Sequence, residues 1–317
     1  MPSVAIIGAG IAGLSCADVL AAEGWQVTLF DKGRKAGGRM ASRRLETLHG
    51  EASFDFGAQY FTVRDPRFAA EVARWAASGL AVRWPDARDD AWIGVPAMNA
   101  VVRAMAAAHT VRFSHHVSGL AREDQHWRLL GEGLPGERFD AAVLALPAEQ
   151  AAPILTLHDF ELARTALFAR SQPCWSGMFA FGEPLPLAAD IVRDHGILAW
   201  AARDSAKPGR SGPESWVVQA TPQWSAANLE RSPDEIAPLL LTALAEAAGT
   251  LRLAPLAHSV HRWRYALSAG TGLGCLWNEA QRIGACGDWL LGPRVECAWV
   301  SGRMLAERML SGARAAA

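Results

Sequence analysis

The sequence predicts a molecule of two parts: an α/β domain assembled from both ends of the chain, and an α+β domain inserted into it. Two observations predict the first part. A strand, a glycine-rich loop and a helix open the chain, and a strand ending in Gly-Asp followed by a helix lies near its end. The mixed strand and helix patterns between them predict the insertion. With 317 residues, the chain is long enough for two hydrophobic cores.

The composition excludes several classes of protein. A formal net charge of −1 argues against a nucleic-acid partner, because such proteins carry a basic excess. No stretch reaches the ~20 continuous apolar residues of a membrane span, and the apolar N-terminal run lacks the basic residues of a signal peptide. Five cysteines without a C-x-x-C pair favour a reducing cytoplasm over a disulfide framework, and no metal site is expected.

The first 31 residues combine all parts of a dinucleotide-binding unit. The apolar run 4–7 is typical of a buried parallel strand. It leads into the G-x-G-x-x-G pattern of residues 8–13, and a helix pattern follows over 11–23. A second strand pattern over 26–30 ends at Asp31. Strand, loop, helix and acid stand in the order and at the spacing of a Rossmann-like fold, so we expect a bound dinucleotide.

Each residue type in this unit has a physical role. Gly8 allows the tight turn, Gly10 lets the backbone approach a pyrophosphate, and Gly13 allows the helix to pack closely on the strand. The helix N-terminus offers unpaired N–H groups and a partial positive charge to the phosphates. An acid at position 31 favours a ribose with a free 2′-hydroxyl, hence FAD or NAD rather than NADP. The cofactor contacts expected here are Gly8, Gly10, Ile11, Ala12, Gly13 and Asp31.

The segment after Asp31 favours FAD over NAD. It runs directly into Gly37-Gly38-Arg39, which resembles the glutathione-reductase-type FAD proteins, in particular the branch of amine oxidases, phytoene desaturases and protoporphyrinogen oxidases. The resemblance implies a non-covalently bound FAD with Arg39 beside its pyrophosphate, where a guanidinium forms a permanently charged bidentate clamp. Lys32 and Met40 belong to the same segment and are expected at the cofactor.

Residues 55–62 read Asp-Phe-Gly-Ala-Gln-Tyr-Phe-Thr and extend this resemblance, because they are similar to the renalase group of the same branch. The resemblance implies that the backbone at Gly57 lies against the isoalloxazine ring of the flavin. The alternative is a strand–loop junction with a buried tyrosine. The cofactor contacts expected here are Phe56, Gly57, Ala58 and Gln59, and the substrate contacts are Tyr60 and Arg64, although Arg64 is equally compatible with a solvated loop.

A second cofactor signature lies near the C-terminal end of the sequence. The strand pattern 283–288 ends in Gly287-Asp288, and a helix pattern begins near Val295. This layout is also similar to the FAD branch, and the resemblance implies that Asp288 binds the ribityl chain. The helix N-terminus at Val295 and Glu296 is expected to face the flavin pyrimidine, where its dipole stabilises negative charge on the reduced ring. By the same resemblance, Val117 pairs its backbone with the adenine.

Two cofactor signatures at opposite ends of the chain imply a discontinuous domain. We predict a Rossmann-like FAD-binding domain over 1–60, 92–150 and 274–317, and a mixed-sheet substrate domain over 61–91 and 151–273. The arrangement is expected to be similar to that of p-hydroxybenzoate hydroxylase. Gly270 to Gly274 looks like another phosphate loop, but no parallel strand and helix bracket it, so we predict a turn there and no second nucleotide domain.

Three functions are compatible with these signatures. The first is a renalase-like oxidase that takes a hydride from 2- or 6-dihydro-NAD(P) isomers onto FAD, with O2 as the electron acceptor and H2O2 as the product. The second is an amine oxidase, which by resemblance places a lysine near the flavin. Only Lys207 lies outside the nucleotide segment, in a predicted turn, and this counts against the second reading. The third is a non-catalytic FAD-binding protein. The oligomeric state stays open.

The chain contains 13 tryptophans, and most of them are expected to pack in the core. The others are expected to wall an apolar pocket over the flavin, where a flat ring can stack. Trp224 and Trp263 are the first choices for this role. Arg264, next to Trp263, is expected to contact the phosphates of the substrate.

Overall fold

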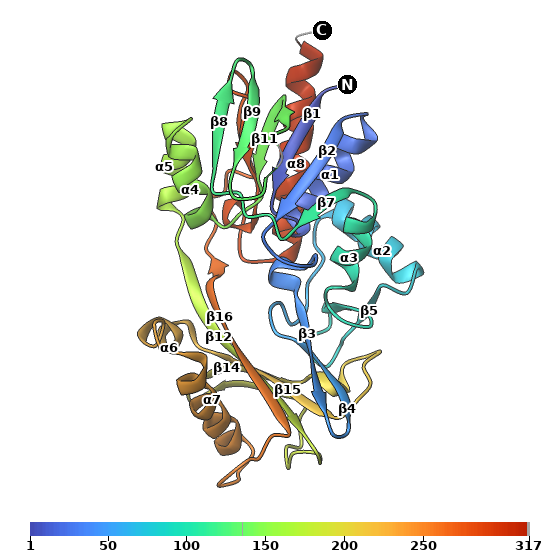
Figure 1. Ribbon diagram of the computed structural model, residues 1–317. Coiled ribbons are helices and arrows are strands. Elements are labelled where there is room, and N and C mark those ends of the chain that lie inside the picture. Colours follow the sequence, from blue (N-terminus) through green and yellow to red (C-terminus); the bar gives the residue numbers. More distant parts are fainter. Residues whose placement is uncertain (135, 316–317) are drawn as a thin grey trace.

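The computed structural model describes residues 1–134 and 136–315, which form two halves joined by long strands (Figure 1). The upper half contains a six-stranded sheet in the order β17-β18-β11-β1-β2-β7. Its strands are parallel except β17, which pairs antiparallel with β18. The bounds are β1 Ser3–Ile7, β2 Gln26–Asp31, β7 Thr110–Phe113, β11 Ala141–Leu144, β17 Leu276–Asn278 and β18 Ile283–Ala285.

Both faces of this sheet are covered, as expected for parallel strands. Val4 and Ile6 of β1 pack into a core with the helices α1 (Ile11–Ala22), α3 (Ala100–Ala107) and α8 (Val295–Ala315). Ala5 and Ile7 face the other way, toward α4 (Ala148–Thr156), α5 (Phe160–Phe168) and a small sheet. That small sheet consists of β8 (Gly119–Glu123), β9 (His126–Leu130) and β10 (Arg138–Phe139).

The lower half is built on an antiparallel five-stranded sheet in the order β13-β14-β15-β12-β16. Its two longest strands, β12 and β16, run from the upper half down into the lower one (Figure 1). The bounds are β12 Ser171–Phe181, β13 Ile191–His195, β14 Leu198–Arg203, β15 Glu214–Ala220 and β16 Ala257–Ser268.

The two faces of this lower sheet differ in what covers them. Trp175 and Phe179 of β12 pack against α7 (Pro233–Ala247), with α6 (Pro222–Ala227) beside it. The alternate residue Met178 packs on the other face against Phe54. Phe54 belongs to a hairpin of β3 (Ser42–Thr47) and β4 (Gly50–Asp55), which descends from the upper half (Figure 1).

Two stretches pack across the predicted domain boundary. The predicted bounds place the β3–β4 hairpin in the FAD domain, yet Ala52 and Phe54 belong to a core with residues of the lower sheet. Conversely, they place α2 (Pro66–Ala77) in the substrate domain, yet Phe68 lies 5.2 Å from Trp299 of α8, ring centroid to ring centroid. A second hairpin, β5 (Ala81–Arg83) and β6 (Trp92–Gly94), follows α2. The two halves therefore share core at these points.

Most predicted elements lie within a few residues of the observed ones. Val117, expected to pair with the adenine, lies in the loop just before β8. The segment from Gly270 to Gly274 is a loop with three glycines at positive φ, and no helix follows it, which confirms the predicted turn. No helix in the described ranges combines the length and the hydropathy that a bilayer crossing requires.

Candidate cofactor site

The glycine loop between β1 and α1 has the geometry that its sequence pattern predicts. Gly8 has φ +108°, and a Cβ there would press into the carbonyl of Ala145. A Cβ at Gly13 would overlap the carbonyl oxygen of Gly8. The equivalent position at Gly10 is open, with no heavy atom within 4 Å, and α1 begins at the next residue. The space in front of this helix N-terminus therefore fits a pyrophosphate.

Asp31 ends β2 and fixes the neighbouring loops. Its Oδ2 accepts a hydrogen bond from the amide of Ala9 at 2.8 Å, and its Oδ1 accepts one from the amide of Gly33 at 2.7 Å. The amide of His115 donates to the carbonyl of Asp31, which brings the segment that contains buried Val117 to the end of β2. These contacts place Asp31 at the expected edge of the sheet, while Lys32 is exposed.

The charged residues of the two cofactor signatures, Arg39 after Gly-Gly and Asp288 after Gly287, contact each other. The Arg39 guanidinium binds the Asp288 carboxylate through both terminal nitrogens, with Nη1 at 2.7 Å from Oδ2. Nη1 also donates to the carbonyl of Ala266, at the end of β16, at 3.2 Å. Residues from the start, the insertion and the end of the chain therefore meet at one guanidinium. The predicted contacts of Arg39 with a pyrophosphate and of Asp288 with a ribityl chain stay predictions.

The segment that resembles a flavin contact lies directly against Arg39. A Cβ at Gly57 would overlap the carbonyl oxygen of Arg39, so no larger residue fits without a shift of the backbone. The amide of Ala58 donates to the same carbonyl at 2.8 Å. Two motifs found separately in the sequence are thus one continuous surface in the structure, next to Gly10 and buried Met40.

Side chains of the lower sheet hold the carbonyls of this segment. Trp263 donates from Nε1 to the carbonyl of Phe56 at 2.9 Å, and the two rings stack with centroids 5.2 Å apart. Gln219 donates from Nε2 to the carbonyl of Gly57 at 2.7 Å. His261 packs edge-on against both rings, and burial together with the charge of Arg43 lowers its pKa to about 4. The imidazole is therefore neutral at pH 7.

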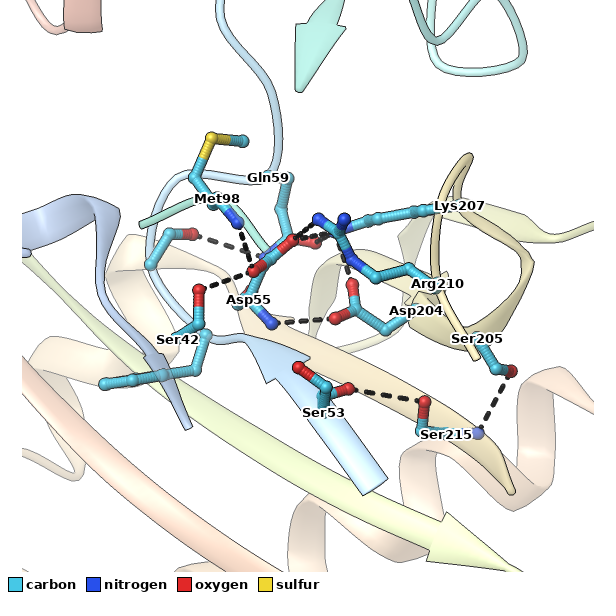
Figure 2. A network of polar contacts seen from close by, with 12 residues as sticks. Ser42, Ser53, Asp55, Gln59, Met98, Asp204, Ser205, Lys207, Arg210 and Ser215 are labelled. Carbon is cyan, nitrogen blue, oxygen red and sulfur yellow. Dashed lines mark hydrogen bonds and ion pairs between the residues drawn. The ribbon is translucent and has the colours of Figure 1, made fainter. Parts of the chain in front are cut away.

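A buried network of charges lies behind the segment and centres on Asp55 (Figure 2). Its Oδ1 accepts from the hydroxyl of Ser42 at 2.7 Å and from the amide of Met98 at 2.8 Å. Its Oδ2 faces Arg210 at 2.5 Å and the ammonium of Lys207 at 3.5 Å. Burial alone raises the pKa of Asp55, but the charges of Lys207 and Arg210 and the hydrogen bonds outweigh it and lower the pKa. Asp55 is therefore ionised.

Asp204 extends the network from the insertion (Figure 2). Its Oδ2 accepts from the amide of Asp55 at 2.7 Å, and its Oδ1 binds the ammonium of Lys207. The ammonium also donates to Oε1 of Gln59 at 3.2 Å and lies 5.0 Å from the ring centroid of Trp84. Burial raises the pKa of Asp204, and the adjacent Lys207 offsets part of that rise.

The structure corrects the sequence-based view of Lys207. The prediction that it lies in a turn is confirmed, since it follows the 3-10 turn Asp204–Ala206. The turn nevertheless directs Lys207 inward, because the side chain is fully buried and contacts Gln59. Nothing local in the sequence indicates this, since the contact joins residues 148 positions apart.

The predicted substrate residues separate into two groups. Tyr60 lies 5.7 Å from Trp200, ring centroid to ring centroid, and Trp263 contacts Phe56, so both lie near the flavin segment. Trp224 is on a helix and packs in the core on the α7 side of the sheet, so the expectation that it faces the flavin with Trp263 is wrong. Arg264 pairs with Glu230, and exposed Arg64 has its backbone fixed by Glu296.

Glu296 has a different environment from the expected one. Its Oε1 accepts from the amides of Arg64 and Asp65 at 2.5 and 2.6 Å, and its Oε2 accepts from Arg294 at 2.7 Å. The carboxylate is buried and holds the segment before α2 against the start of α8. Gly287 lies nearby, and its amide donates to the hydroxyl of Ser301 at 3.0 Å. Val295 is the first residue of α8, as predicted.

Sequence reasoning missed four residues that build this site: Gln219, Asp204, Arg210 and Trp200. Each lies in the insertion, and none belongs to a local motif. Within the described part of the chain, no group of three or more metal-ligating side chains is suited to hold a metal ion. Open space at Gly10, the glycine approach at Gly57 and the meeting of Arg39 with Asp288 together fit an extended dinucleotide with a flat ring at one end.

Comparisons with known proteins agree with this geometry. The family described as NAD(P)-binding Rossmann-like domain matches residues 6–75, and the family described as flavin containing amine oxidoreductase matches residues 82–310. The chain is an FAD-dependent oxidoreductase. It belongs to the flavin containing amine oxidoreductase family, whose match covers most of its length.

Similar structures share the fold at low sequence identity. A proposed protoporphyrinogen oxidase from Exiguobacterium sp. 255-15 is 13% identical, with a TM-score of 0.77 over 97% of this chain and 98% of that one. Cyclohexylamine oxidase from Brevibacterium oxydans IH-35A is 13% identical, with a TM-score of 0.71 over 99% of both chains.

Curated relatives match over shorter stretches. The bifunctional protein of tRNA 5-methylaminomethyl-2-thiouridine biosynthesis from Cupriavidus necator is 26% identical in an alignment of 242 positions that covers 59% of this chain. A 4,4′-diapophytoene desaturase from Staphylococcus haemolyticus is 40% identical over 62 residues, or 20% of this chain. The matches span only 35% and 12% of these two relatives.

Proposed function

We propose that this enzyme is a renalase-like oxidase that converts 2- and 6-dihydro isomers of NAD(P) into NAD(P)+, with O2 as acceptor. Bound FAD supplies the redox chemistry, since its ring accepts a hydride and passes two electrons on. The overall reaction consumes one dihydronicotinamide, one O2 and one proton, and yields NAD(P)+ and H2O2. We place it in the cytoplasm, which the five unpaired cysteines favour.

The similarity of the two-domain arrangement to that of p-hydroxybenzoate hydroxylase stays a prediction.

The environment of Lys207 is the observation that favours a dihydronicotinamide substrate over an amine. The ammonium binds Asp204, donates to Gln59 and lies 3.5 Å from the Asp55 carboxylate. The side chain is fully buried among these groups, which does not suit it to hold a water at the flavin, the role that the amine-oxidase reading requires. A reaction that needs only a positioned hydride donor is compatible with this arrangement.

The remaining side chains near Gly57 are suited to bind and orient a flat, charged substrate. Tyr60 and Trp200 form an aromatic pair beside the flavin segment, where a nicotinamide ring can stack. Arg64 is exposed at the start of α2, and we propose that it binds a phosphate of the dinucleotide. Trp263 excludes water from the segment by packing on Phe56.

An amine oxidase is the second candidate. The matched family is described by amine oxidation, and a similar structure is a cyclohexylamine oxidase. The aromatic pair of Tyr60 and Trp200 is equally suited to an amine substrate. The burial of Lys207 against Asp204 and Gln59 argues against this candidate.

Anaerobic reduction of the FAD-loaded enzyme tests the proposal. Borohydride-generated dihydro-NAD isomers are mixed with the enzyme, and loss of flavin absorbance near 450 nm is followed in a stopped-flow instrument. Benzylamine and putrescine are tested in parallel, and ordinary 4-dihydro-NADH is the matched control. We expect rapid bleaching by the 2- and 6-dihydro isomers only. Bleaching by an amine at a comparable rate, or no bleaching by any isomer, would contradict the proposal.

A further inference from the structure

The buried charges behind the flavin segment require an explanation beyond stability. The side chains of Asp55, Asp204 and Lys207 are fully buried, and that of Arg210 is 2% exposed. Taking charges out of water is costly even when they are paired, and well-packed apolar side chains are often at least as stable. The position of the network in the fold is therefore more informative than its strength.

The network joins two segments that are far apart in sequence (Figure 2). One is the flavin segment, residues 55–59, and the other is the turn 204–210 of the insertion. Asp204 accepts from the backbone amide of Asp55, and Arg210 binds the Asp55 carboxylate and the carbonyl of Gly94. The insertion thus holds the base of the flavin segment by main-chain and side-chain contacts.

Lys207 also determines how the amide of Gln59 is oriented. An ammonium donates only, so the Gln59 atom beside it is the acceptor, Oε1. The Nε2 group then points the opposite way, where it donates to the carbonyl of Asp55 and, at 3.3 Å, to that of Gly57. One buried ammonium therefore sets the orientation of the Gln59 amide, which binds the carbonyls of Asp55 and Gly57.

We propose that Lys207 is a positioning residue for the flavin. It acts through Gln59, whose amide holds Gly57 and Ala58 in the conformation that receives the isoalloxazine ring. Lys207, a residue of the insertion, in this way influences the cofactor environment without touching the cofactor itself. The proposal rests on the FAD site and not on the identity of the substrate.

The test replaces Lys207 in the FAD-loaded enzyme by an uncharged side chain of similar length. In K207M we expect a shifted flavin absorption spectrum and a shifted midpoint potential. The rate constant of flavin reduction should fall by about 10- to 100-fold, because a small misplacement of the ring is costly in rate. The dissociation constant of the reducing substrate should change by less than about 3-fold.

A double-mutant cycle tests whether Lys207 acts through Gln59. Q59L alone should shift the spectrum and the potential, and K207M/Q59L should be no worse than Q59L. Additive effects of the two substitutions would overturn the proposal. A K207M enzyme with the wild-type spectrum and potential but a lower rate would also overturn it, since that pattern belongs to a residue in direct contact with the reacting atoms.

Two further variants keep the test interpretable. L240A removes an equally buried side chain of α7, which packs on the far face of the lower sheet, so it should lower stability without shifting the spectrum. If K207M fails to load FAD, D204N is used instead, because it removes a charge that holds Lys207 and should also shift the flavin spectrum from that of the wild type. An unshifted D204N spectrum would contradict the proposal. Spectrum and potential need no substrate, so these outcomes are distinguishable from failure of the proposed function.

Discussion

The two ends of the cofactor site are built in different ways. At the nucleotide end, backbone geometry does the work: Gly8 and Gly13 allow close approach, and Gly10 leaves open space before α1. At the flavin end, side chains from distant segments hold the backbone, since Gln219, Trp263 and the buried charge network all bind residues 55–59. The nucleotide end therefore depends on positions that lack a side chain, and the flavin end depends on side chains that form hydrogen bonds and ion pairs.

This difference explains how each end responds to change. Glycine positions fail by steric overlap, which is local and independent of pH. The flavin end fails by leaving buried polar groups without partners, which is costly and, for titratable groups, dependent on pH. Substitutions at the two ends should therefore differ in size and in the conditions that reveal them.

Removing a charge from the network should have the largest effect. R210M leaves the Asp55 carboxylate with a weaker partner in a sealed site, so the free energy of unfolding should fall by about 3–5 kcal/mol. Urea denaturation of the FAD-free protein measures it. R231M, which removes an exposed pair with Glu235, is the control and should change it by less than about 1 kcal/mol. A loss in R210M as small as in the control would mean that the network adds nothing to stability.

At the nucleotide end, stability and cofactor binding should separate. G13A places a methyl group against the Gly8 carbonyl and should destabilise the FAD-free protein by about 1–3 kcal/mol. G10A meets no protein atom, so it should cost less than about 1 kcal/mol in the FAD-free protein. It should nevertheless weaken FAD binding in a fluorescence titration, because the methyl group enters the pyrophosphate space. Normal FAD affinity in G10A would mean that the pyrophosphate does not bind beside Gly10.

The pH dependence of the flavin end should include a contribution from His261. Burial lowers the pKa of this imidazole from 6.5 to about 4, so the unfolded chain takes up a proton at a higher pH than the folded one. Its stabilising contribution is full above pH 6.5 and is lost as pH falls toward 4. Solvent screening of this partly buried group limits the loss to about 1–2 kcal/mol. H261Q should flatten the stability curve in this window, and an unchanged slope would exclude the contribution.

The smallest expected effect compares the two faces of the insertion sheet. W263F removes the hydrogen bond to Phe56 and should cost about 1 kcal/mol while shifting the flavin spectrum. W224F, on the α7 side, should reduce stability by a similar amount and leave the spectrum unchanged. Equal spectral shifts in the two variants would erase the distinction between the faces.

The sequence predicts the local fold of the nucleotide end well because its determinants are local. Gly8, Gly10 and Gly13 lie within six residues, and the strand and helix around them follow from hydrophobic spacing. The Gly-Asp strand at 283–288 is equally local, and its partner helix is predicted within a residue. The identity of the cofactor, FAD, comes from the resemblance to a known family, and the family match supports it.

The flavin end was predicted only in part because its contacts are long-range. Gly57 and Gln59 are visible in a motif, but the residues that hold them come from 204–219 and 263. The expectation for Trp224 rests on the tryptophan count and on its place in the insertion, and a tryptophan in an inserted domain fills a core more often than it faces a ligand. Lys207 was discounted because a turn suggests exposure, whereas this turn is folded inward onto Asp55.

The packing of α8 on α1 has a consequence for the order of events during synthesis. A Cβ at Gly302 would overlap the carbonyl of Ala12, so the first and last helices of the FAD half are in intimate contact. Asp288 must also reach Arg39 before the site is complete. A ribosome adds residues one at a time from the N-terminus, and domains fold as they emerge. The insertion therefore emerges whole before its host domain is complete, and FAD meets a finished site only after the chain has passed residue 302.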